Sequence, residues 1–418
     1  MTKKDAVIVY GAGISGRGAA QVLADRKQQV YLYNDMDCTL EPQLLQLLES
    51  VGGGLAIGQA AFEGLLDIAG VLVLSPGIAC DNANVLLAEQ RGLEVISEVE
   101  LGYRLYGGHI AAITGTNGKT TTTTIVGEML KRLPEPSAVG GNIGLALSKE
   151  VESLPQDGWL AAELSSFQLE KVSSFCPDIA VVLNLTPDHL ERHHTMEAYG
   201  AAKARIFENQ DESGYCIVNY DDKLCYGLTK DCKAKVIPFS IKEELPLGAY
   251  LRADGMLVLR NEEGREIELC HRNELKIIGD HNVQNALAAA AISYFSGIDA
   301  ETIHESLLAF GGVPHRIEYC GEIGGVKFYN DSKGTNVDAA VIALKAIQKN
   351  ILLIAGGDGK GQEFDELIEN FPGRVKHMIL LGRDGKLLAE AAERHGFKDY
   401  SFAPHMEECV KNAFAMAK

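Results

Sequence analysis

A hydrophobic segment that runs directly into a glycine- and lysine-containing loop, and then into a helix-forming segment, constrains this chain more than any other feature. The segment is HIAAITGTNGKTTTTTIV, residues 109–126. Backbone N–H groups at a helix N-terminus, a lysine ammonium and a hydroxyl converge there on one point, which suits a triphosphate. The residue five positions before Gly118 is Ile113 rather than glycine, so the loop is a shortened form of the Gly-x4-Gly-Lys-Ser/Thr phosphate loop.

Two side chains of this loop carry the predicted chemistry. We expect Lys119 to neutralise charge on the β- and γ-phosphates and the Thr120 hydroxyl to ligate Mg²⁺. A solvated, threonine-rich helix start does not explain a lysine preceded by glycines. The residues predicted to bind the triphosphate are Gly115, Thr116, Asn117, Gly118, Lys119, Thr120 and Thr121.

Short Val/Ile/Leu-rich runs recur along the chain, each followed by a glycine-containing turn and a segment with helical spacing. This pattern predicts an α/β fold with parallel sheets. The runs form three groups, at residues 1–97, 98–312 and 313–418. We expect strands at 6–10, 29–35, 71–78, 93–97, 109–115, 159–166, 179–186, 216–222, 326–332, 350–357, 377–382 and 399–403, with an antiparallel patch at 249–269 where DG and EEG offer hairpin turns.

Charge and cysteine content narrow the possible partners. Lys and Arg number 39 against 57 Asp and Glu, a net charge of −18, so we expect neither nucleic acid nor a membrane as partner. The N-terminus lacks a signal-peptide core, and no apolar run is long enough to span a bilayer. Nine scattered cysteines without a C-x-x-C spacing indicate free thiols in a reducing cytoplasm.

A second glycine-rich turn opens the chain. Gly11-x-Gly13-x-x-Gly16 follows a predicted strand, and Asp35 stands at the tip of the next one. Glycines there let the backbone approach a pyrophosphate, and Asp35 can accept a hydrogen bond from a ribose hydroxyl. Because the group is only about half the length of a full dinucleotide domain, the motif leaves NAD, a uridine diphosphate and an adenine diphosphate open.

Polar residues cluster at the ends of three further predicted strands. Asn142 lies in GGNIG, Glu163 in WLAAELSS, and His189 in VVLNLTPDH. Open α/β sheets bind ligands at such strand ends, and oxygen ligands beside a triphosphate suit Mg²⁺. Glu163 and His189 are therefore candidate metal ligands, whereas we expect His193 and His194 to be solvated.

In combination, the motifs GTNGKTT, ELSSFQLE, NLTPDHLERH, AAKARIF, GDHNVQNALAA, PHR and NDSKGTN resemble the Mur ligases, the ATP-dependent amide-forming enzymes of peptidoglycan precursor synthesis. GAGISGRGAA, SPGI and NDSKGTN are similar to the D-glutamate-adding branch. The resemblance implies three domains: an N-terminal Rossmann-like UDP-sugar domain (1–97), a central P-loop-type ATPase domain (98–312) and a C-terminal Rossmann-like, amino-acid-binding α/β domain (313–418).

The resemblance also implies roles for individual residues. It assigns the UDP-sugar to Ile14, Ser15, Asp35, Ser75, Gly77, Asn142 and Ser165, and thereby favours uridine at the first glycine turn. It assigns the adenine end of ATP to Asn282 and Asn285, the γ-phosphate to Arg316 and the ATP ribose to Asp331. It assigns D-glutamate to Lys333, Thr335 and Lys360, and the metal site, of two Mg²⁺ ions, to Thr120, Glu163, His189 and Lys203. The implied catalytic residues are Lys119, His189, Lys203 and Arg316.

Lys203 in YGAAKARIF matches a lysine that the family carbamylates with CO₂. An ammonium repels Mg²⁺, whereas a carbamate has the opposite charge and two oxygens suited to a hard cation. The alternative is a solvated lysine on an alanine-rich helix.

The implied reaction starts with transfer of the γ-phosphoryl group to the carboxylate of UDP-N-acetylmuramoyl-L-alanine. The D-glutamate amine then attacks the acyl phosphate and phosphate leaves. We expect a cytoplasmic monomer. The family continues with a strand, an SPAxAS-like turn and an Asp-x-Phe segment that are not found before Lys418, so we expect a truncated last domain with weakened D-glutamate binding.

Three other interpretations remain open at this stage. A folylpolyglutamate-type ligase, or another Mur-type ligase, shares the ATPase core. An NAD-dependent dehydrogenase explains GAGISG and Asp35 but leaves GTNGKTT without a role. A non-catalytic nucleotide-binding regulator is the alternative outside the enzymes.

Overall fold

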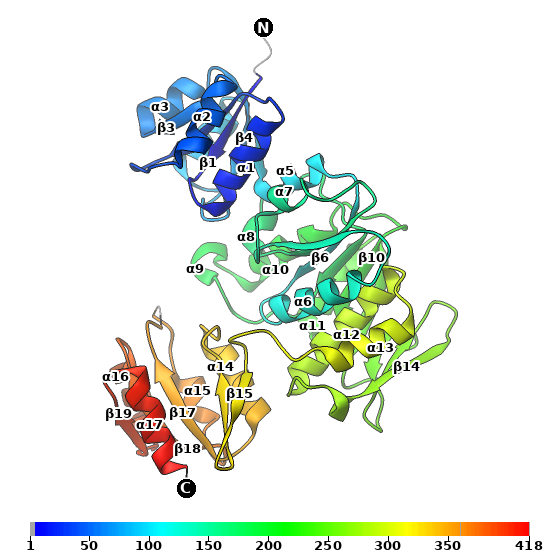
Figure 1. Ribbon diagram of the computed structural model, residues 1–418, viewed down its shortest axis with the longest axis vertical. Coiled ribbons are helices and arrows are strands. Elements are labelled where there is room, and N and C mark those ends of the chain that lie inside the picture. Colours follow the sequence, from blue (N-terminus) through cyan, green and yellow to red (C-terminus); the bar gives the residue numbers. More distant parts are fainter. Residues whose placement is uncertain (1–4, 360, 418) are drawn as a thin grey trace. The chain divides into compact units, whose positions relative to one another are not determined.

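The computed structural model describes residues 5–359 and 361–417. The chain divides into two compact units, the first made of Met1–Arg272 with Gln284–Leu308 and the second of Asn273–Val283 with Ala309–Lys418. Figure 1 shows helices packed against sheets throughout. The predicted α/β class, with parallel sheets, is confirmed.

The first sheet is parallel and five-stranded, in the order β3-β2-β1-β4-β5. Its strands are β1 (Ala6–Tyr10), β2 (Val30–Asn34), β3 (Gly54–Ile57), β4 (Ala69–Leu74) and β5 (Glu94–Ser97), and its helices are α1 (Ile14–Asp25), α2 (Pro42–Ser50), α3 (Gln59–Leu65) and α4 (Ala83–Gln90). The sequence did not predict β3. This short edge strand has one β-branched residue and is only partly buried, so it lacks the usual strand signal.

The second sheet has nine strands, in the order β14-β13-β12-β11-β10-β9-β6-β8-β7. They are β6 (His109–Thr114), β7 (Ser137–Gly141), β8 (Trp159–Glu163), β9 (Ile179–Val182), β10 (Tyr215–Asn219), β11 (Lys235–Ser240), β12 (Gly248–Leu251), β13 (Met256–Arg260) and β14 (Glu266–His271). The predicted antiparallel patch is confirmed, since β12, β13 and β14 pair antiparallel. The sequence did not predict β7, which holds two glycines, or β11, which holds Pro238.

Helices alternate with the strands of this second sheet along the chain (Figure 1). They are α5 (Glu98–Leu105), α6 (Lys119–Leu130), α7 (Leu147–Glu150), α8 (Ser166–Leu169), α9 (Leu190–His193), α10 (Met196–Ala204), α11 (Lys223–Gly227), α12 (Asp280–Phe295) and α13 (Ala300–Ala309). Because β6 pairs with β8 and β9 on its two sides, the loop after β6 leaves the interior of the sheet. Helix α6 is buried along much of its length, including the threonines at 120–123.

The second unit contains an antiparallel pair, β15 (Glu318–Ile323) with β16 (Val326–Asn330), and a parallel sheet of β17 (Ile351–Gly356), β18 (Val375–Leu381) and β19 (Tyr400–Phe402). Its helices are α14 (Val337–Ile347), α15 (Asp365–Glu369), α16 (Gly385–Arg394) and α17 (Met406–Met416). The sequence did not predict β15. Gly324 and Gly325, both with positive φ, form the hairpin turn, and this Gly-Gly pair was the available signal.

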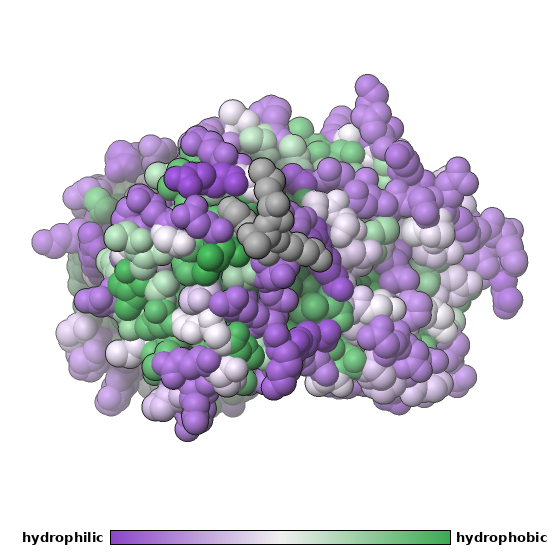
Figure 2. Space-filling model, turned by 90° about the horizontal axis from the view of Figure 1, so that it is seen from above, coloured by the Kyte–Doolittle hydropathy of each residue, from purple (hydrophilic) through white to green (hydrophobic). Residues whose placement is uncertain are grey.

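Polar side chains cover much of the face shown in Figure 2, with apolar side chains between them. All nine cysteines are free thiols, as predicted. Among the residues described, no helix is long and apolar enough to cross a membrane.

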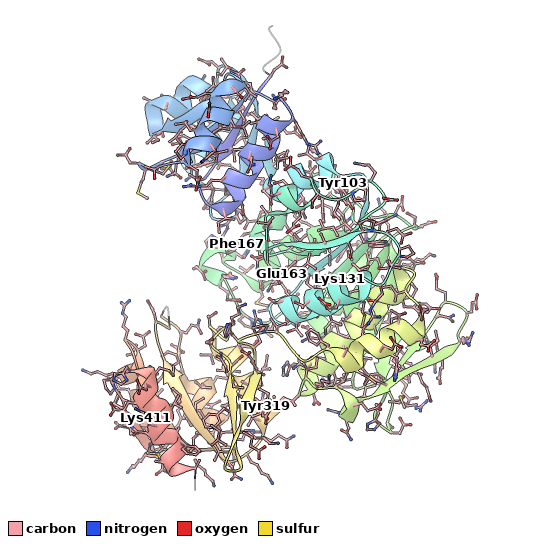
Figure 3. All side chains as sticks on the ribbon, viewed as in Figure 1. Tyr103, Lys131, Glu163, Phe167, Tyr319 and Lys411 are labelled. Carbon is pink, nitrogen blue, oxygen red and sulfur yellow. The ribbon has the colours of Figure 1, made fainter. Side chains whose placement is uncertain are left out.

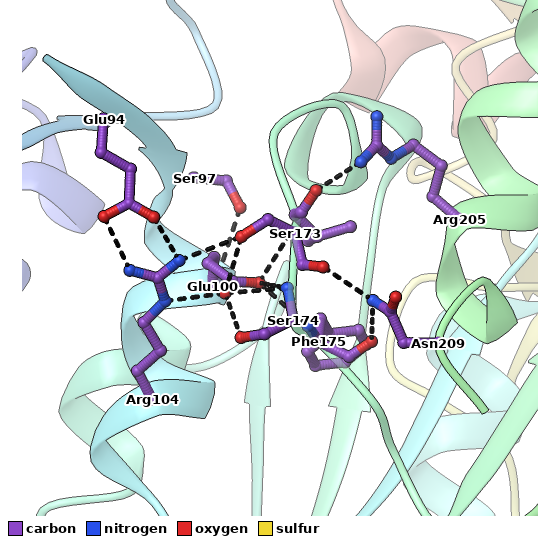
Figure 4. A network of polar contacts seen from close by, with 10 residues as sticks. Glu94, Ser97, Glu100, Arg104, Ser173, Ser174, Phe175, Arg205 and Asn209 are labelled. Carbon is purple, nitrogen blue, oxygen red and sulfur yellow. Dashed lines mark hydrogen bonds and ion pairs between the residues drawn. The ribbon is translucent and has the colours of Figure 1, made fainter. Parts of the chain in front are cut away.

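A buried carboxylate joins α5 to the loop after α8 (Figure 4). The Glu100 side chain is 0% exposed and pairs with Arg104. It also accepts hydrogen bonds from the backbone N–H groups of Ser173, Ser174 and Phe175. Burial by itself raises the pKa of Glu100, but the hydrogen bonds from Ser174 and Ser173 and the contact with Arg104 outweigh it and lower the pKa to about 2.

We predict that Glu100 contributes stability that acid removes. Because its pKa is depressed in the folded protein, the contribution is full above the ordinary value of 4.5 and is lost as the pH falls from there toward about 2. Glu100→Gln should therefore lower the melting temperature at pH 7 and reduce its dependence on pH below about 5. Melting curves recorded at a series of pH values test this.

The matched control is Glu128→Gln, which removes a carboxylate in an exposed pair with Lys131. Such pairs contribute little, so the control should melt like the wild type. A Glu100→Gln melting temperature that falls with acid as steeply as that of the wild type would contradict the prediction.

Candidate functional site

The predicted phosphate loop connects β6 to α6. Gly115 and Gly118 have φ angles of +150° and +85°, which side chains with a Cβ rarely adopt. Lys119 is the first residue of α6, and its Nζ donates to the carbonyl oxygens of Gly115 and Thr116, both at 2.8 Å. The lysine therefore lies over the loop backbone, at the N-terminus of a 12-residue helix, where an anion is favoured.

Asn184, which follows β9, holds the loop in place. Its Oδ1 accepts from the Asn117 N–H at 2.8 Å, and its Nδ2 donates to the Asn117 carbonyl at 2.9 Å. Next to it, the Thr186 N–H donates to Thr116 Oγ1 at 3.1 Å. Asn184 begins the motif NLTPDHLERH, and its only signal in the sequence is an amide side chain shortly after a buried strand.

Asn285 of α12 lies against the same loop. A Cβ added at Gly118 would lie 2.3 Å from Asn285 Oδ1, and that oxygen accepts from Thr122 Oγ1 at 3.3 Å. Asn282 lies one turn earlier on the helix, and its Nδ2 donates to the Ile278 carbonyl at 2.8 Å.

Glu163, labelled in Figure 3, ends β8 and is 2% exposed. Its Oε1 accepts from Asn142 Nδ2 at 2.8 Å. Its Oε2 is buried and has no hydrogen-bond partner among the described residues. A buried carboxylate oxygen without a donor is costly, and a hard cation such as Mg²⁺ is a ligand that would satisfy it.

His189 lies at the start of α9 with a φ of +54°. Its ring centroid is 4.8 Å from that of Phe167, and its nitrogens lie 3.6 Å from Asp188 Oδ2 and 3.4 Å from Glu191 Oε1. Within the described chain, no group of three or more His, Cys, Asp and Glu residues is arranged to hold a metal ion. The described residues therefore show no metal site made of such side chains around Glu163 or His189.

The prediction that His193 and His194 are solvated is correct for His194 and wrong for His193. His194 is exposed as expected, but His193 is 8% exposed, with its Nε2 2.9 Å from Ser166 Oγ. Burial lowers its pKa. A pattern of two adjacent histidines does not reveal which of them faces α8.

Lys203 is one of the most deeply buried side chains, at 1% exposure. Its Nζ donates to the Gly115 carbonyl at 2.9 Å and lies 3.4 Å from Thr114 Oγ1 and 4.6 Å from the ring centre of Tyr199. Burial, and then the charge of Lys119, hold its pKa well below the usual lysine value. The alternative of a solvated lysine is therefore wrong.

The second glycine-rich turn lies at the carboxyl edge of the first sheet. Gly16 packs so closely that an added Cβ would lie 1.8 Å from the Gly11 carbonyl oxygen, which also accepts from Ser75 Oγ at 3.1 Å. Ile14 is 79% exposed beside this turn. The candidate residues Ile14, Ser15, Asp35, Ser75 and Gly77 all follow the ends of β1, β2 and β4.

The second unit holds the remaining candidates. The Asp331 carboxylate accepts from the Ile317 N–H at 3.0 Å, and burial raises its pKa. Arg316 is the residue before Ile317. Lys333 and Thr335 are exposed and lie shortly after β16. Lys360 lies outside the described residues.

Two family models match the chain: the Mur ligase middle domain over residues 113–293, and the Mur ligase glutamate ligase domain over residues 315–418. The UDP-N-acetylmuramoylalanine--D-glutamate ligase of Thermoanaerobacter sp. (strain X514) is 43% identical over 99% of this chain and 90% of the relative. The enzyme of the same name from Caldanaerobacter subterraneus subsp. tengcongensis is 42% identical over 100% and 91%. The crystal structure of MurF from Acinetobacter baumannii shares the fold, with a TM-score of 0.61 and 18% identity, over 98% of this chain and 86% of that one.

We predict that Gly118→Ala destabilises the phosphate loop. An alanine there costs about 1–2 kcal/mol because its backbone is left-handed. Its Cβ would also clash with Asn285 Oδ1, which adds to that cost. Gly264→Ala is the matched control, because Gly264 has a φ of +76° and open space around it. Thermal melting should show a larger loss for Gly118→Ala, and equal losses in the two variants would contradict a contact with Asn285.

Proposed function

The chain belongs to the Mur ligase family, and we propose that it joins D-glutamate to UDP-N-acetylmuramoyl-L-alanine with hydrolysis of ATP to ADP and phosphate. The two relatives of this name described above are 43% and 42% identical to it over nearly its whole length. The observation that carries the proposal is the convergence of two lysines, Lys119 and Lys203, on the carbonyl oxygen of Gly115. A site with this charge at the N-terminus of α6 calls for an anionic ligand.

ATP supplies the activation that a carboxylate lacks toward an amine. We propose that the phosphate loop binds the β- and γ-phosphates, with the Lys119 ammonium reducing repulsion during in-line transfer of the γ-phosphoryl group. The acceptor is the L-alanyl carboxylate, which becomes an acyl phosphate. The D-glutamate amine, having lost a proton, then attacks the acyl carbon, the amide bond forms and phosphate leaves.

Mg²⁺ suits the residues present, since Glu163 offers a buried carboxylate oxygen without a hydrogen-bond donor among the described residues. We propose that Thr120, Glu163, His189 and a carbamylated Lys203 hold two ions. When bound, Mg²⁺ supplies Lewis-acid stabilisation of charge on phosphate oxygens. Asn142 donates to the other oxygen of Glu163 and so fixes the carboxylate plane.

The remaining assignments follow the family division into domains at 1–97, 98–312 and 313–418. We propose that Ile14, Ser15, Asp35, Ser75, Gly77, Asn142 and Ser165 bind the UDP-sugar, that Asn282, Asn285, Arg316 and Asp331 bind ATP, and that Lys333, Thr335 and Lys360 bind D-glutamate. We further propose that the enzyme works as a monomer in the cytoplasm, without nucleic acid or membrane partners.

We predict that phosphate release depends on UDP-N-acetylmuramoyl-L-alanine and on D-glutamate together, with L-glutamate and D-aspartate as poor replacements. Lys119→Ala should lower the rate roughly a hundredfold to a thousandfold, the usual cost of losing one donor that stabilises transition-state charge. Lys131→Ala, at the exposed C-cap of the same helix, is the control and should retain the wild-type rate. Release of phosphate that does not require D-glutamate would contradict the proposed substrate.

Carbamylation of Lys203 is the second part of the proposal. The Nζ is buried, and its hydrogen bonds go to the Gly115 carbonyl and to Thr114 Oγ1, neither of which is a carboxylate. Formation of a carbamate joins the lysine nitrogen to the carbon of CO₂ and releases one proton. The reacting form is the neutral amine, and the product is an anion beside the ammonium of Lys119.

We predict that protein equilibrated with carbon-13-labelled bicarbonate gives a carbamate NMR signal that Lys203→Met abolishes and the exposed-site control Lys131→Met retains. Ligase activity of Lys203→Met should fall by about a hundredfold, a loss typical of removing a group that supports a catalytic metal. An unchanged signal in Lys203→Met, or full activity without one in the wild type, would overturn the carbamate.

A further inference from the structure

The carboxylate of Asp35 is held by two tyrosines from inside the first sheet. The Tyr10 hydroxyl donates to Asp35 Oδ2 at 2.6 Å, and the Tyr33 hydroxyl donates to Oδ1 at 2.8 Å. Asp35 itself is exposed, whereas both tyrosines are 0% exposed. Each carboxylate oxygen thus has its own phenol donor on the protein side.

The two phenols are rigidly placed. Tyr10 and Tyr33 occupy paired positions on the adjacent strands β1 and β2. Their ring centroids are 4.8 Å apart, and Phe62 of α3 packs 4.7 Å from the Tyr33 ring and 6.1 Å from the Tyr10 ring. Because interior side chains are close-packed, the hydroxyl groups stay at the carboxyl edge of the sheet.

Neighbouring amides complete the network. Asn84 Nδ2 donates to the Tyr33 hydroxyl at 3.1 Å and to Asp35 Oδ1 at 3.3 Å, and Tyr10 lies 3.4 Å from Asn82 Oδ1. Burial, followed by the hydrogen bond to Asp35, raises the pKa of Tyr10 to about 12 and raises the pKa of Tyr33 as well. Both phenols therefore remain donors at physiological pH.

An exposed aspartate at a strand end would ordinarily rotate, and a ligand would have to immobilise it. Here both oxygens are fixed, and an ionised carboxylate can only accept hydrogen bonds. Each oxygen has further acceptor capacity on its exposed side. The site is thus preorganised for a ligand that presents an N–H or O–H donor, such as the base or ribose of a nucleotide.

We propose that Tyr10 and Tyr33 are positioning residues that orient the Asp35 carboxylate toward a donor group on the nucleoside of the UDP-sugar. This inference rests on the proposed function, which assigns Asp35 to that substrate. The phenols act through Asp35 and do not contact the ligand. Phe62 and Asn84 keep the phenols in place.

The test is the affinity of the full-length protein for UDP, measured by calorimetry, in the variants Tyr10→Phe and Tyr33→Phe. Each variant keeps the ring and removes one donor to a charged acceptor, so we expect UDP to bind roughly fivefold to tenfold more weakly. The KM for the UDP-sugar should rise by a similar factor, with kcat, the KM for ATP and the melting temperature unchanged. Tyr31→Phe is the matched control, because Tyr31 is on β2 with Tyr33 but donates to the Gly52 carbonyl. The affinity of this variant for UDP should equal that of the wild type.

Analogues of UDP separate positioning from a general effect on the sheet. The same variants are measured with 3-methyl-UDP, which lacks the base N–H, and with 2′,3′-dideoxy-UDP, which lacks the ribose hydroxyls. One analogue lacks the group that donates a hydrogen bond to Asp35. For that analogue alone, the wild type and the Phe variants should bind with equal affinity. A purely structural role would weaken all three ligands alike.

The possible failures are distinguishable. If the wild type does not bind UDP, both the proposed substrate and this inference are overturned. If the wild type binds UDP and the Phe variants bind it equally well, the inference is overturned and the proposed function stands. Weaker binding of all three ligands, or a lowered melting temperature that accounts for the loss, also overturns the positioning role.

Discussion

The contact of two lysine Nζ atoms with the carbonyl oxygen of Gly115 dominates the electrostatics at the phosphate loop of the second sheet. Lys119 reaches it from the start of α6 and Lys203 from α10. One carbonyl dipole does not neutralise two charges, and charge repulsion is strong where water is excluded. The arrangement therefore gains most from anions, and a triphosphate and the carbamate proposed for Lys203 would both provide them. Burial and the same repulsion lower the pKa of Lys203, which favours the neutral amine, the form that reacts with CO₂.

Two buried carboxylates, Glu100 and Glu163, differ in how the fold satisfies their oxygen atoms. Glu100 is buried among backbone and hydroxyl donors and an arginine, so its charge is balanced within the fold. Glu163 is equally buried, but one of its oxygens lacks a hydrogen-bond partner among the described residues. An unsatisfied buried oxygen costs stability, and a bound cation would compensate for that cost at Glu163. Burial alone would not separate these two residues, whereas their hydrogen bonds do.

Features set by neighbouring residues could be predicted from the sequence, whereas features set by distant residues could not. The phosphate loop, the first glycine turn and the hairpins at DG and EEG have short-range signals, and the structure has the loops and turns where these predict them. Strands β3, β7 and β11 lack such signals because their pairing partners, not their own residues, stabilise them. His193 was wrongly expected to be solvated for a similar reason, since its burial depends on Ser166, 27 positions away in sequence.

The side chains that hold a site residue or loop in place by a hydrogen bond, here called anchors, are the hardest to predict from the sequence. They share one geometry. Tyr10 ends β1 and fixes Asp35 after β2, Asn142 follows β7 and fixes Glu163 on β8, and Asn184 follows β9 and fixes the loop after β6. In each case the anchor comes from the strand adjacent in the sheet. Parallel strands bring their carboxyl ends to one edge, so the neighbouring strand is the nearest rigid source of a hydrogen bond. Strand order, which a sequence pattern does not contain, therefore determines which residue supports which ligand.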